Sequence, residues 1–493
     1  MEMPRKKENC SLLDYSVELS DSFRKIYSVE KRKEKGQFFT NKKVASFMAS
    51  LLDLRHAEIK LLDPGAGTGI LSAAICDRII LESKNKLNLT IDCYEQDSEV
   101  VPYLECLMSE CKNVFEKHGH ELSFNIYESN FILDNANHYK RKYDLAISNP
   151  PYYKLRKDSA ESLAVDHLKL DSPNIYSLFM LIVAKMLKKN GEMIFIVPRS
   201  FCSGLHFKKT RRWLVENLHF ENIHLFKSRT NIFDDNEVHQ ENIIFKAIKK
   251  FPGERGTVVS SSYSKEFEDF FKIEATFSDI IFSKNGENYI RIPTSEKDLK
   301  IIRIVDSWEH KLEDFGMTVS TGKVVDFRTK ENLREDYSEK DCVPLIWLQN
   351  LEKNGVNLNP ENFNKKRGIN VNKKTSRVLI PVKNYVLMKR LTSKCSKKRI
   401  FAAPFLRKEF KNFKLVGFEN HLNYICGINR DLDVNEVNCL CAFLTSDIVD
   451  EYFRIINGST QVNASELLKM PLPKYDLMYK LANVRNLDEV QDM

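Results

Sequence analysis

A strand-like segment near residue 145 ends in side chains suited to holding a flat group that carries an amine. Residues 143–147 form a largely apolar run, and the next motif is Asn149, Pro150, Pro151 and Tyr152. Two successive prolines lack backbone N–H groups and cannot continue a central strand. The pattern predicts a buried strand that stops in a stiff turn with polar and aromatic groups at its tip.

These residue types suit attack by an aromatic amine, whose lone pair is otherwise delocalised into the ring. Asn149 offers a side-chain carbonyl, and Pro150 leaves its own carbonyl free, so two acceptors could hold both hydrogens of an exocyclic amine. The ring of Tyr152 could stack on the group that carries the amine. The acceptors would draw the nitrogen toward tetrahedral geometry, which frees its lone pair for attack and stabilises the positive charge that develops.

A glycine-rich turn earlier in the chain indicates a cofactor. Residues 61–75 read LLDPGAGTGILSAAI, and Gly65, Gly67 and Gly69 would allow a tight strand–helix turn and a close ligand approach. The spacing is GxGxG rather than the GxGxxG of dinucleotide enzymes. A purely structural turn is the alternative, so this loop alone predicts only a nucleotide-like cofactor.

Two later strand ends offer further contacts for such a cofactor. Glu95 follows a strand-like run, and a carboxylate there suits a ribose diol because it can accept two hydroxyl hydrogen bonds. Asn130 and Phe131 end the next run, near the expected position of a base ring. A solvated glutamate and a core aromatic are the alternatives for Glu95 and Phe131.

Alternating strand-like and helix-like runs from about residue 61 to 246 predict a doubly wound, Rossmann-like α/β sheet, in which these strand tips share one crevice. Residues 249–265 are rich in Pro, Gly and Ser and predict a linker. We therefore expect a catalytic domain at 1–255 and a mixed α+β domain at 266–493.

The second half contains a strongly basic segment at residues 364–399, with apolar and aromatic residues between the charges. A solvated basic face and a phosphate-contacting surface are both compatible with this pattern. The overall excess of 76 Lys and Arg over 68 Asp and Glu permits a polyanionic partner without requiring one.

The remaining composition is that of an ordinary globular protein. The 493 residues are too many for one core, and no apolar run is long enough to span a membrane. The N-terminus lacks the apolar segment of a secretory signal. Eleven cysteines are scattered singly, so we expect reduced thiols, no metal site and a cytoplasmic protein.

The motifs in combination resemble those of S-adenosylmethionine-dependent amino-methyltransferases, with DPGAGTG, then YEQD, then NPPY. Residues 35–52 precede the glycine loop and look like the motif that brackets the methionine end of the cofactor in that family. With a long variable region last, this order resembles the gamma class of DNA adenine-N6 methyltransferases, whose familiar member is the TaqI methyltransferase.

The resemblance implies a role for each matching position. The methionine end of the cofactor would be held by Thr40, Asp63, Gly65, Ala66 and Gly67. Its ribose would be held by Glu95, and its adenine by Asn130 and Phe131, although many relatives have Asp where Asn130 stands. The target adenine would be held by Asn149, Pro150 and Tyr152, and Phe233 would cover its other face; a core aromatic is the alternative for Phe233.

This chemistry requires the target base to leave the duplex, so the enzyme must also grip DNA elsewhere. That requirement favours phosphate and base contacts in the basic C-terminal half. The segments at 320–328, 418–425 and 459–473 look like segments of target-recognition domains in restriction-modification methyltransferases. Residues 384–400 followed by 418–424 resemble the PstI-type subgroup, which modifies adenine in CTGCAG.

The resemblance implies a bacterial type II modification enzyme that acts on double-stranded DNA as a monomer and protects it from a partner restriction endonuclease. No nuclease motif in a convincing strand context is found in the chain itself. Other NPPY enzymes methylate RNA or protein glutamine, but these are usually shorter and lack a large recognition domain. A DNA-binding module with an inactive methyltransferase fold is a further alternative, disfavoured by the intact NPPY and glycine motifs.

Overall fold

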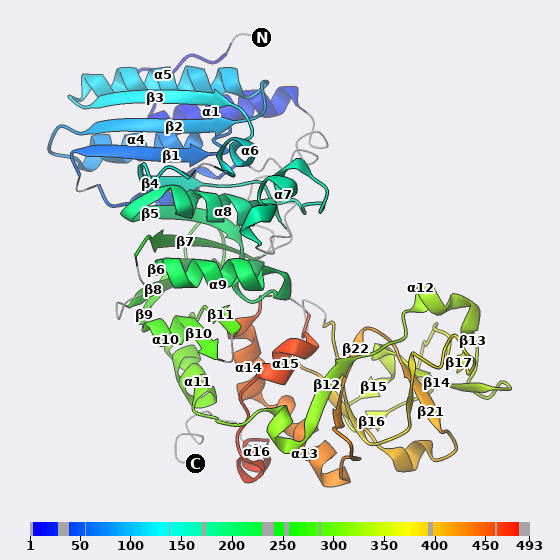
Figure 1. Cartoon of the computed structure of the whole chain (residues 1–493). Coiled ribbons are helices and arrows are strands. Elements are labelled where there is room, and N and C mark those ends of the chain that lie inside the picture. The colour runs from blue at the N-terminus through cyan, green and yellow to red at the C-terminus, as the bar shows by residue number, and fades with distance from the viewer. Residues whose placement is uncertain are drawn as a thin grey trace. The chain divides into compact units, whose positions relative to one another are not determined.

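The computed structural model divides the chain into two compact units, Met1–Glu296 and Lys297–Met493 (Figure 1). The structure describes residues 3–27, 39–54, 56–137, 139–169, 174–228, 241–250, 256–284, 287–392, 398–458 and 461–482.

A nine-stranded sheet forms the centre of the first unit, in the order β3-β2-β1-β4-β5-β7-β6-β8-β9. The strands are β1 Glu58–Pro64, β2 Asn88–Glu95, β3 Glu121–Glu128, β4 Tyr143–Ser148, β5 Leu187–Pro198, β6 His219–Phe226, β7 Asn242–Ile248, β8 Thr257–Ser262 and β9 Phe271–Ala275. The first five pair in parallel, whereas β7 runs antiparallel to both β5 and β6. The carboxyl ends of β1, β2, β3 and β4 therefore lie at one edge.

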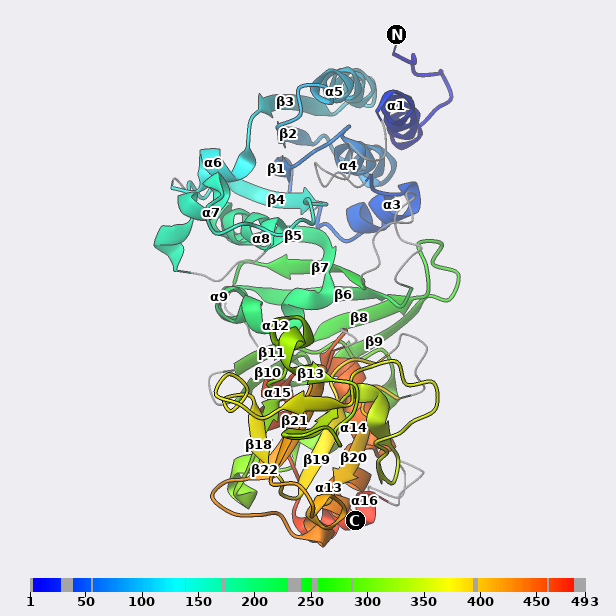
Figure 2. The ribbon, with the colours of Figure 1, turned by 90° about the vertical axis from the view of Figure 1, so that its right-hand side faces the viewer.

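Helices cover both faces of this sheet, as Figure 2 shows. One layer contains α1 Leu12–Ile26, α3 Lys42–Ser50, α4 Ile70–Glu82 and α5 Val101–Lys117, and the other contains α6 Phe131–Asn135, α7 Ala160–Ala164, α8 Ile175–Met186 and α9 Lys208–Asn217. The predicted doubly wound α/β fold is confirmed. Within the described ranges, no helix is both long and apolar enough to cross a membrane.

Burial explains which segments become strands and which become helices. Five of the six residues of β4 are buried, as expected for a parallel strand that is covered on both faces. In α8, eleven of the twelve residues are buried, because the helix is apolar on nearly all sides. This packing fixes the end of β4, and therefore the turn that follows it.

The division between the units differs from the one predicted between residues 255 and 266. Residues 257–262, expected in a linker, form β8 within the large sheet, parallel to β6. The serines that suggested a linker are buried: Ser260 and Ser262 lie 2.9 and 3.0 Å from the ring nitrogens of His224. The contacts divide the chain after Glu296 instead, because the last two strands extend the first sheet. A small hairpin precedes this point, with α10 Phe277–Ile280, β10 Ile281–Lys284 and β11 Glu287–Ile290.

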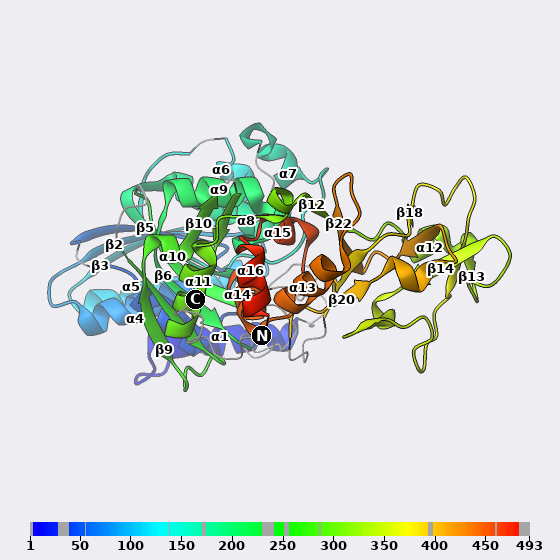
Figure 3. The same ribbon diagram turned by 90° about the horizontal axis from the view of Figure 1, so that it is seen from below.

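The second unit mixes short sheets with helices. Its four-stranded sheet has the order β12-β22-β19-β20, its five-stranded sheet has the order β13-β17-β14-β21-β18, and β15 pairs with β16. The strands are β12 Met317–Thr321, β13 Leu333–Arg334, β14 Cys342–Ile346, β15 Leu351–Glu352, β16 Gly355–Val356, β17 Gly368–Asn370, β18 Leu379–Pro381, β19 Tyr385–Lys389, β20 Ala402–Phe405, β21 Leu415–Phe418 and β22 Leu422–Gly427. The helices are α11 Glu296–Asp306, α12 Asp326–Thr329, α13 Val434–Leu444, α14 Asp447–Ile456, α15 Ala464–Lys469 and α16 Tyr475–Leu481. Figure 3 shows α13, α14 and α16 at one end of the unit and β13, β14 and β18 at the other.

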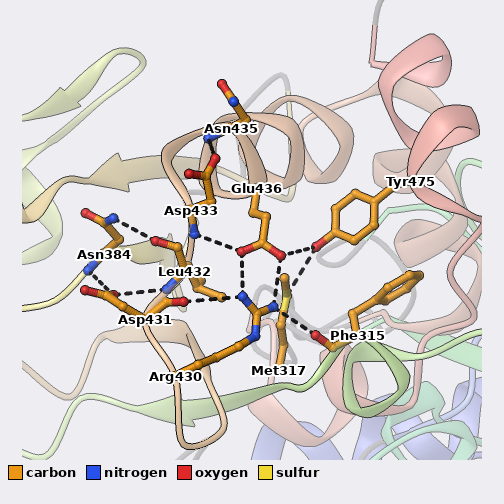
Figure 4. A network of polar contacts seen from close by, with 10 residues as sticks. All are labelled: Phe315, Met317, Asn384, Arg430, Asp431, Leu432, Asp433, Asn435, Glu436 and Tyr475. Carbon is orange, nitrogen blue, oxygen red and sulfur yellow. Dashed lines mark hydrogen bonds and ion pairs between the residues drawn. The ribbon is translucent and has the colours of Figure 1, made fainter.

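A polar network ties the helical end of the second unit together (Figure 4). The Arg430 guanidinium donates to both carboxylate oxygens of Glu436 on α13, at 2.7 and 2.9 Å, and to the Phe315 carbonyl. The hydroxyl of Tyr475, from α16, donates to the same carboxylate. The hydrogen bond from Arg430 is the largest influence that lowers the pKa of Glu436. One bidentate ion pair thus joins the end of β22 to two helices.

The amphipathic N-terminal segment of the sequence forms α1, which packs against α4 and α5. Its first turn is held by Asp77 of α4, whose two carboxylate oxygens accept the backbone N–H groups of Leu12 and Leu13 at 3.0 and 2.8 Å. Farther along α1, the hydroxyls of Ser20 and Thr68 lie 2.6 Å apart. The helix therefore contacts the glycine loop directly.

We predict that Asp77→Ala lowers the free energy of unfolding by about 1–2 kcal/mol, because a helix N-terminus loses an anionic cap. Chemical denaturation measures this change, and hydrogen exchange of the α1 amides locates it. Glu105→Ala, at an exposed position of α5, is the control and should change the stability by less than about 0.5 kcal/mol. Equal stability of the Asp77 variant and the wild type would contradict the assigned cap.

Candidate active site

The loop after β1 is a tight glycine turn beside a cavity. Gly65, Gly67 and Gly69 have φ values of 72°, 56° and 90°, in the left-handed region that glycine adopts without steric cost. A side-chain carbon at Gly69 would approach Leu107 to 2.7 Å, whereas one at Gly67 would meet no atom within 4 Å. The loop thus packs tightly against α5 and leaves open space beside Gly67.

A cavity of about 430 Å³ lies at the carboxyl edge of the sheet and gathers most of the predicted site residues. Those that line it are Thr40, Gly65, Ala66, Gly67, Glu95, Asn130, Phe131 and Asn149. Asp63, Pro150 and Tyr152 do not line it, and Phe233 falls outside the described residues. Strand pairing alone explains this gathering, because four successive parallel strands end at the same edge.

Glu95, at the end of β2, is held rigidly against the glycine loop. One carboxylate oxygen accepts the backbone N–H of Gly67 at 2.9 Å, and the other accepts that of Asp97 at 2.9 Å. Burial raises the pKa of Glu95, and these backbone hydrogen bonds oppose the increase. Each oxygen retains a lone pair, so the carboxylate can still accept from a diol in the cavity.

Asp63 lies beneath the loop rather than in the cavity wall. It is fully buried, and one of its oxygens accepts the hydroxyl of Ser72 on α4 at 2.6 Å. Its other oxygen has no hydrogen-bond partner among the described residues. Burial raises the pKa of Asp63 to about 7. Its position indicates that Asp63 braces the first turn of α4 and provides a buried acceptor close to the cavity floor.

Asn130 and Phe131 line the cavity and also have structural roles outside it. The Asn130 amide oxygen caps α6, accepting the N–H groups of Ile132 and Leu133 at 3.0 and 3.2 Å. Both its lone pairs are therefore engaged by the cap, and the predicted contact of Asn130 with the cofactor's adenine stays a prediction. Phe131 is buried and contacts Tyr94 and Phe179 with ring centroids 5.2 and 5.1 Å away. It is both a core aromatic and part of the cavity wall.

Asn149 stands at the end of β4 with both ends of its amide engaged. Its nitrogen donates to the Thr40 hydroxyl at 3.1 Å, and its oxygen accepts the Tyr152 hydroxyl at 2.7 Å. The turn itself is tied to the glycine loop, since the Ser148 hydroxyl donates to the Pro64 carbonyl at 2.8 Å.

Tyr152 lies behind Asn149 rather than on the cavity wall. Its hydroxyl is also within 2.9 Å of the Ile196 carbonyl, and its ring meets Tyr176 edge-on at 6.2 Å. Burial raises the pKa of Tyr152, so the hydroxyl stays protonated and remains a donor. The sequence predicted that the ring of Tyr152 stacks on the target base. The structure adds a contact between the Tyr152 hydroxyl and the Asn149 side-chain oxygen, which is predicted to accept from the amine.

Several lining residues were not predicted from the sequence. Tyr153 and Pro151 come from the NPPYY turn itself, and Phe179 comes from the buried helix α8. The second tyrosine of the turn, Tyr153, could have been predicted as a lining residue because it directly follows the NPPY motif. Phe179 could not, because it lies within an apolar run in which nearly every residue is buried.

The cavity fits a nucleoside that carries an amino-acid tail. It combines open space beside a glycine backbone, a buried carboxylate acceptor and aromatic walls. Among the described residues, no group of three His, Cys, Asp or Glu side chains could hold a metal ion. These features match the predicted cofactor, S-adenosylmethionine.

Comparison with known proteins identifies relatives across the whole chain. The family model described as Eco57I restriction-modification methylase matches residues 70–233. Type II methyltransferase M.PstI of Providencia stuartii is 34% identical, with 93% of this chain and 91% of the relative covered. Type II methyltransferase M.BsuBI of Bacillus subtilis is 34% identical, with 94% and 93% covered. The predicted PstI-like subgroup is confirmed.

A solved structure described as the ATP-dependent Type ISP restriction-modification enzyme LlaBIII bound to DNA shares the fold. It covers 99% of this chain and 42% of its own, with a TM-score of 0.50 and 10% identity. Because M.PstI and M.BsuBI match nearly the whole chain, the cofactor is S-adenosylmethionine and the substrate is DNA, methylated at specific sites within a restriction-modification system. The chain belongs to the family of type II DNA methyltransferases that includes M.PstI and M.BsuBI.

Proposed function

We propose that this chain methylates N6 of an adenine that has been flipped out of duplex DNA. The observation that carries the proposal is the amide oxygen of Asn149 at the cavity edge, oriented by contacts with Thr40 and Tyr152. An oriented carbonyl next to a proline carbonyl suits a group that presents two N–H hydrogens on one nitrogen. Adenine N6 is such a group, and its position within the stacked duplex requires the base to be extruded.

Bound S-adenosylmethionine supplies an electrophilic methyl group on a sulfonium. Asn149 and Pro150 hold the amine hydrogens, so the nitrogen lone pair is directed at the methyl carbon. The new N–C bond would form as the S–C bond breaks, with the electron pair of the broken bond left on sulfur. The positive charge that develops on nitrogen meets acceptors already in place, and one N–H proton then leaves to solvent.

The recognition sequence, the roles of the two units and the biological setting are proposed from the family and from the residues. We propose CTGCAG as the recognition sequence, because the C-terminal segments resemble the PstI-type subgroup. The second unit, Lys297–Met493, would be the target-recognition domain, and the first would carry catalysis. The enzyme would work as a monomer in the bacterial cytoplasm and protect DNA from a partner restriction endonuclease.

Expression in a bacterial host without DNA methylation tests the base and the sequence together. Single-molecule sequencing of the host genome should detect N6-methyladenine at one short motif, expected to be CTGCAG. N6-methyladenine at a different single motif would refute CTGCAG as the recognition sequence but would still support adenine N6 as the methylated position. A soluble, cofactor-binding protein that leaves no modified adenine would refute the proposal and favour an RNA or protein substrate.

Asn149→Ala should reduce the rate of methyl transfer by at least about 10²-fold, because the preorganised acceptor for the amine is lost. A single-turnover assay with labelled cofactor on duplex DNA measures the rate. The same variant should bind cofactor and DNA with near wild-type affinity, which serves as the internal control. Retention of near-normal turnover would show that another group holds the amine.

Tyr152→Phe should slow methyl transfer by about five-fold, the equivalent of one neutral hydrogen bond worth about 1 kcal/mol. The ring remains, so only the hydroxyl contact with the Asn149 oxygen is removed. Tyr152→Ala should be slower than Tyr152→Phe and faster than Asn149→Ala, since it also removes the ring. If Tyr152→Phe equals the wild type while Tyr152→Ala is slow, then the ring acts alone and the hydroxyl has no role.

A further inference from the structure

Three C-terminal segments singled out in the sequence meet at one end of a sheet in the second unit. The strand β12 pairs with β22 from Met317 opposite Gly427 to Thr321 opposite Asn423, and the two strands are labelled next to each other in Figure 1. The buried Asn423 of β22 accepts the Thr321 hydroxyl at 3.0 Å and donates to the Val462 carbonyl at 2.7 Å. Residues 320–328, 418–425 and 461–473 are thus held together by one amide.

Beyond this amide, the loop after β12 lies directly on residues 418–420. The Gly322 N–H donates to the Leu422 carbonyl at 2.8 Å, and the Val324 N–H donates to the Phe418 carbonyl at 3.0 Å. A side-chain carbon at Gly322 would lie only 2.6 Å from the Phe418 carbonyl oxygen and would also clash with that of Glu419. The close backbone contact leaves little freedom for the Glu419–His421 turn.

This turn contains a buried carboxylate that holds an exposed imidazole. The Glu419 side chain is 0% exposed and that of His421 is 43% exposed. One Glu419 oxygen lies 2.6 Å from His421 Nδ1, and the other accepts the His421 backbone N–H at 3.0 Å. The buried carboxylate thereby fixes the orientation of the ring, with Nδ1 turned toward Glu419. His421 Nε2 makes no hydrogen bond with any described residue and is directed away from Glu419.

Arg390 is paired with His421 through the backbone. The Arg390 N–H donates to the His421 carbonyl at 2.9 Å, one position beyond the antiparallel pair Lys389 and Leu422. Directly opposed residues on antiparallel strands present their side chains on the same face. The Arg390 guanidinium donates from Nη1 to the Asn420 carbonyl at 3.2 Å, and its other N–H groups have no acceptor among the described residues.

The Arg390 guanidinium and His421 Nε2 thus both retain hydrogen-bonding capacity beside the turn. An external anion would accept the remaining N–H groups of the guanidinium. The planar guanidinium matches the geometry of a phosphate, and Nε2 of a doubly protonated His421 ring would add a further donor. Since the family's substrate is DNA, the anion of matching chemistry is a phosphodiester of the duplex backbone.

We propose that Arg390 and His421 bind one phosphate of the DNA substrate and that Glu419 is a positioning residue that orients His421. The assignment rests on DNA being the substrate and does not depend on which base is methylated. It specifies where, within the basic segment 364–399 and the adjoining turn, the second unit grips the backbone. The contact sets affinity and register without reading sequence.

The experiment measures binding of the full chain to two duplexes by fluorescence anisotropy, at salt concentrations from about 50 to 200 mM. One duplex contains the methylated motif and the other does not. Arg390→Gln and His421→Gln should each weaken binding to both duplexes by a similar factor, about 3–10-fold. Each should also reduce the slope of log K against log salt by about one. The methylated motif should stay the same.

The control is Lys311→Gln, a substitution of a cation in the same unit that is paired with Glu313 at 3.2 Å. It should change neither affinity nor salt slope. Glu419→Gln should weaken binding as His421→Gln does, and should have no further effect when His421 is already replaced. This non-additivity separates positioning from a general loss of folding, which would add to any other change.

Unchanged salt slopes in both the Arg390 and His421 variants would overturn the phosphate assignment. Weaker binding to only one of the two duplexes would also overturn it, because it would indicate contact with a base edge. If the wild type modifies no adenine, the proposed reaction fails, but the salt slopes still decide the phosphate site because they require only DNA binding.

Discussion

Parallel strand pairing is the constraint on which the active site depends. Four neighbouring strands run in the same direction, so the loops that follow them open at one edge of the sheet. Residues separated by more than eighty positions, such as Pro64 and Ser148, are thereby brought within hydrogen-bonding distance. This pairing is what makes the glycine turn, Glu95 and the NPPY turn adjacent. The active site therefore depends on the pairing of the strands as well as on the residues of each motif.

Much of this arrangement could be predicted from the sequence, because it rests on local patterns. Positive φ at Gly65 and Gly67, the end of β4 before two prolines and the position of Glu95 all follow from residue type and strand periodicity. What could not be predicted was the use of each polar atom. The Asn130 oxygen caps a helix and Tyr152 points its hydroxyl at Asn149, and both depend on three-dimensional neighbours that no local pattern specifies.

The boundary between the two units also shows where prediction from local sequence fails. Ser, Gly and Pro indicate a loop when they face water, but Ser260 and Ser262 face a buried histidine and lie in a strand. Composition describes a residue's preference in isolation, whereas burial depends on the partner across the sheet. In the second unit, short strands and few periodic segments left even less local information, and the meeting of three distant segments at Asn423 was visible only in the structure.

The hydroxyl contact between Ser20 and Thr68 makes the N-terminal helix part of the cofactor-binding apparatus. Thr68 lines the cavity, so any ligand that orders the glycine loop also favours the docked position of α1. By thermodynamic linkage, cofactor binding and helix docking stabilise each other.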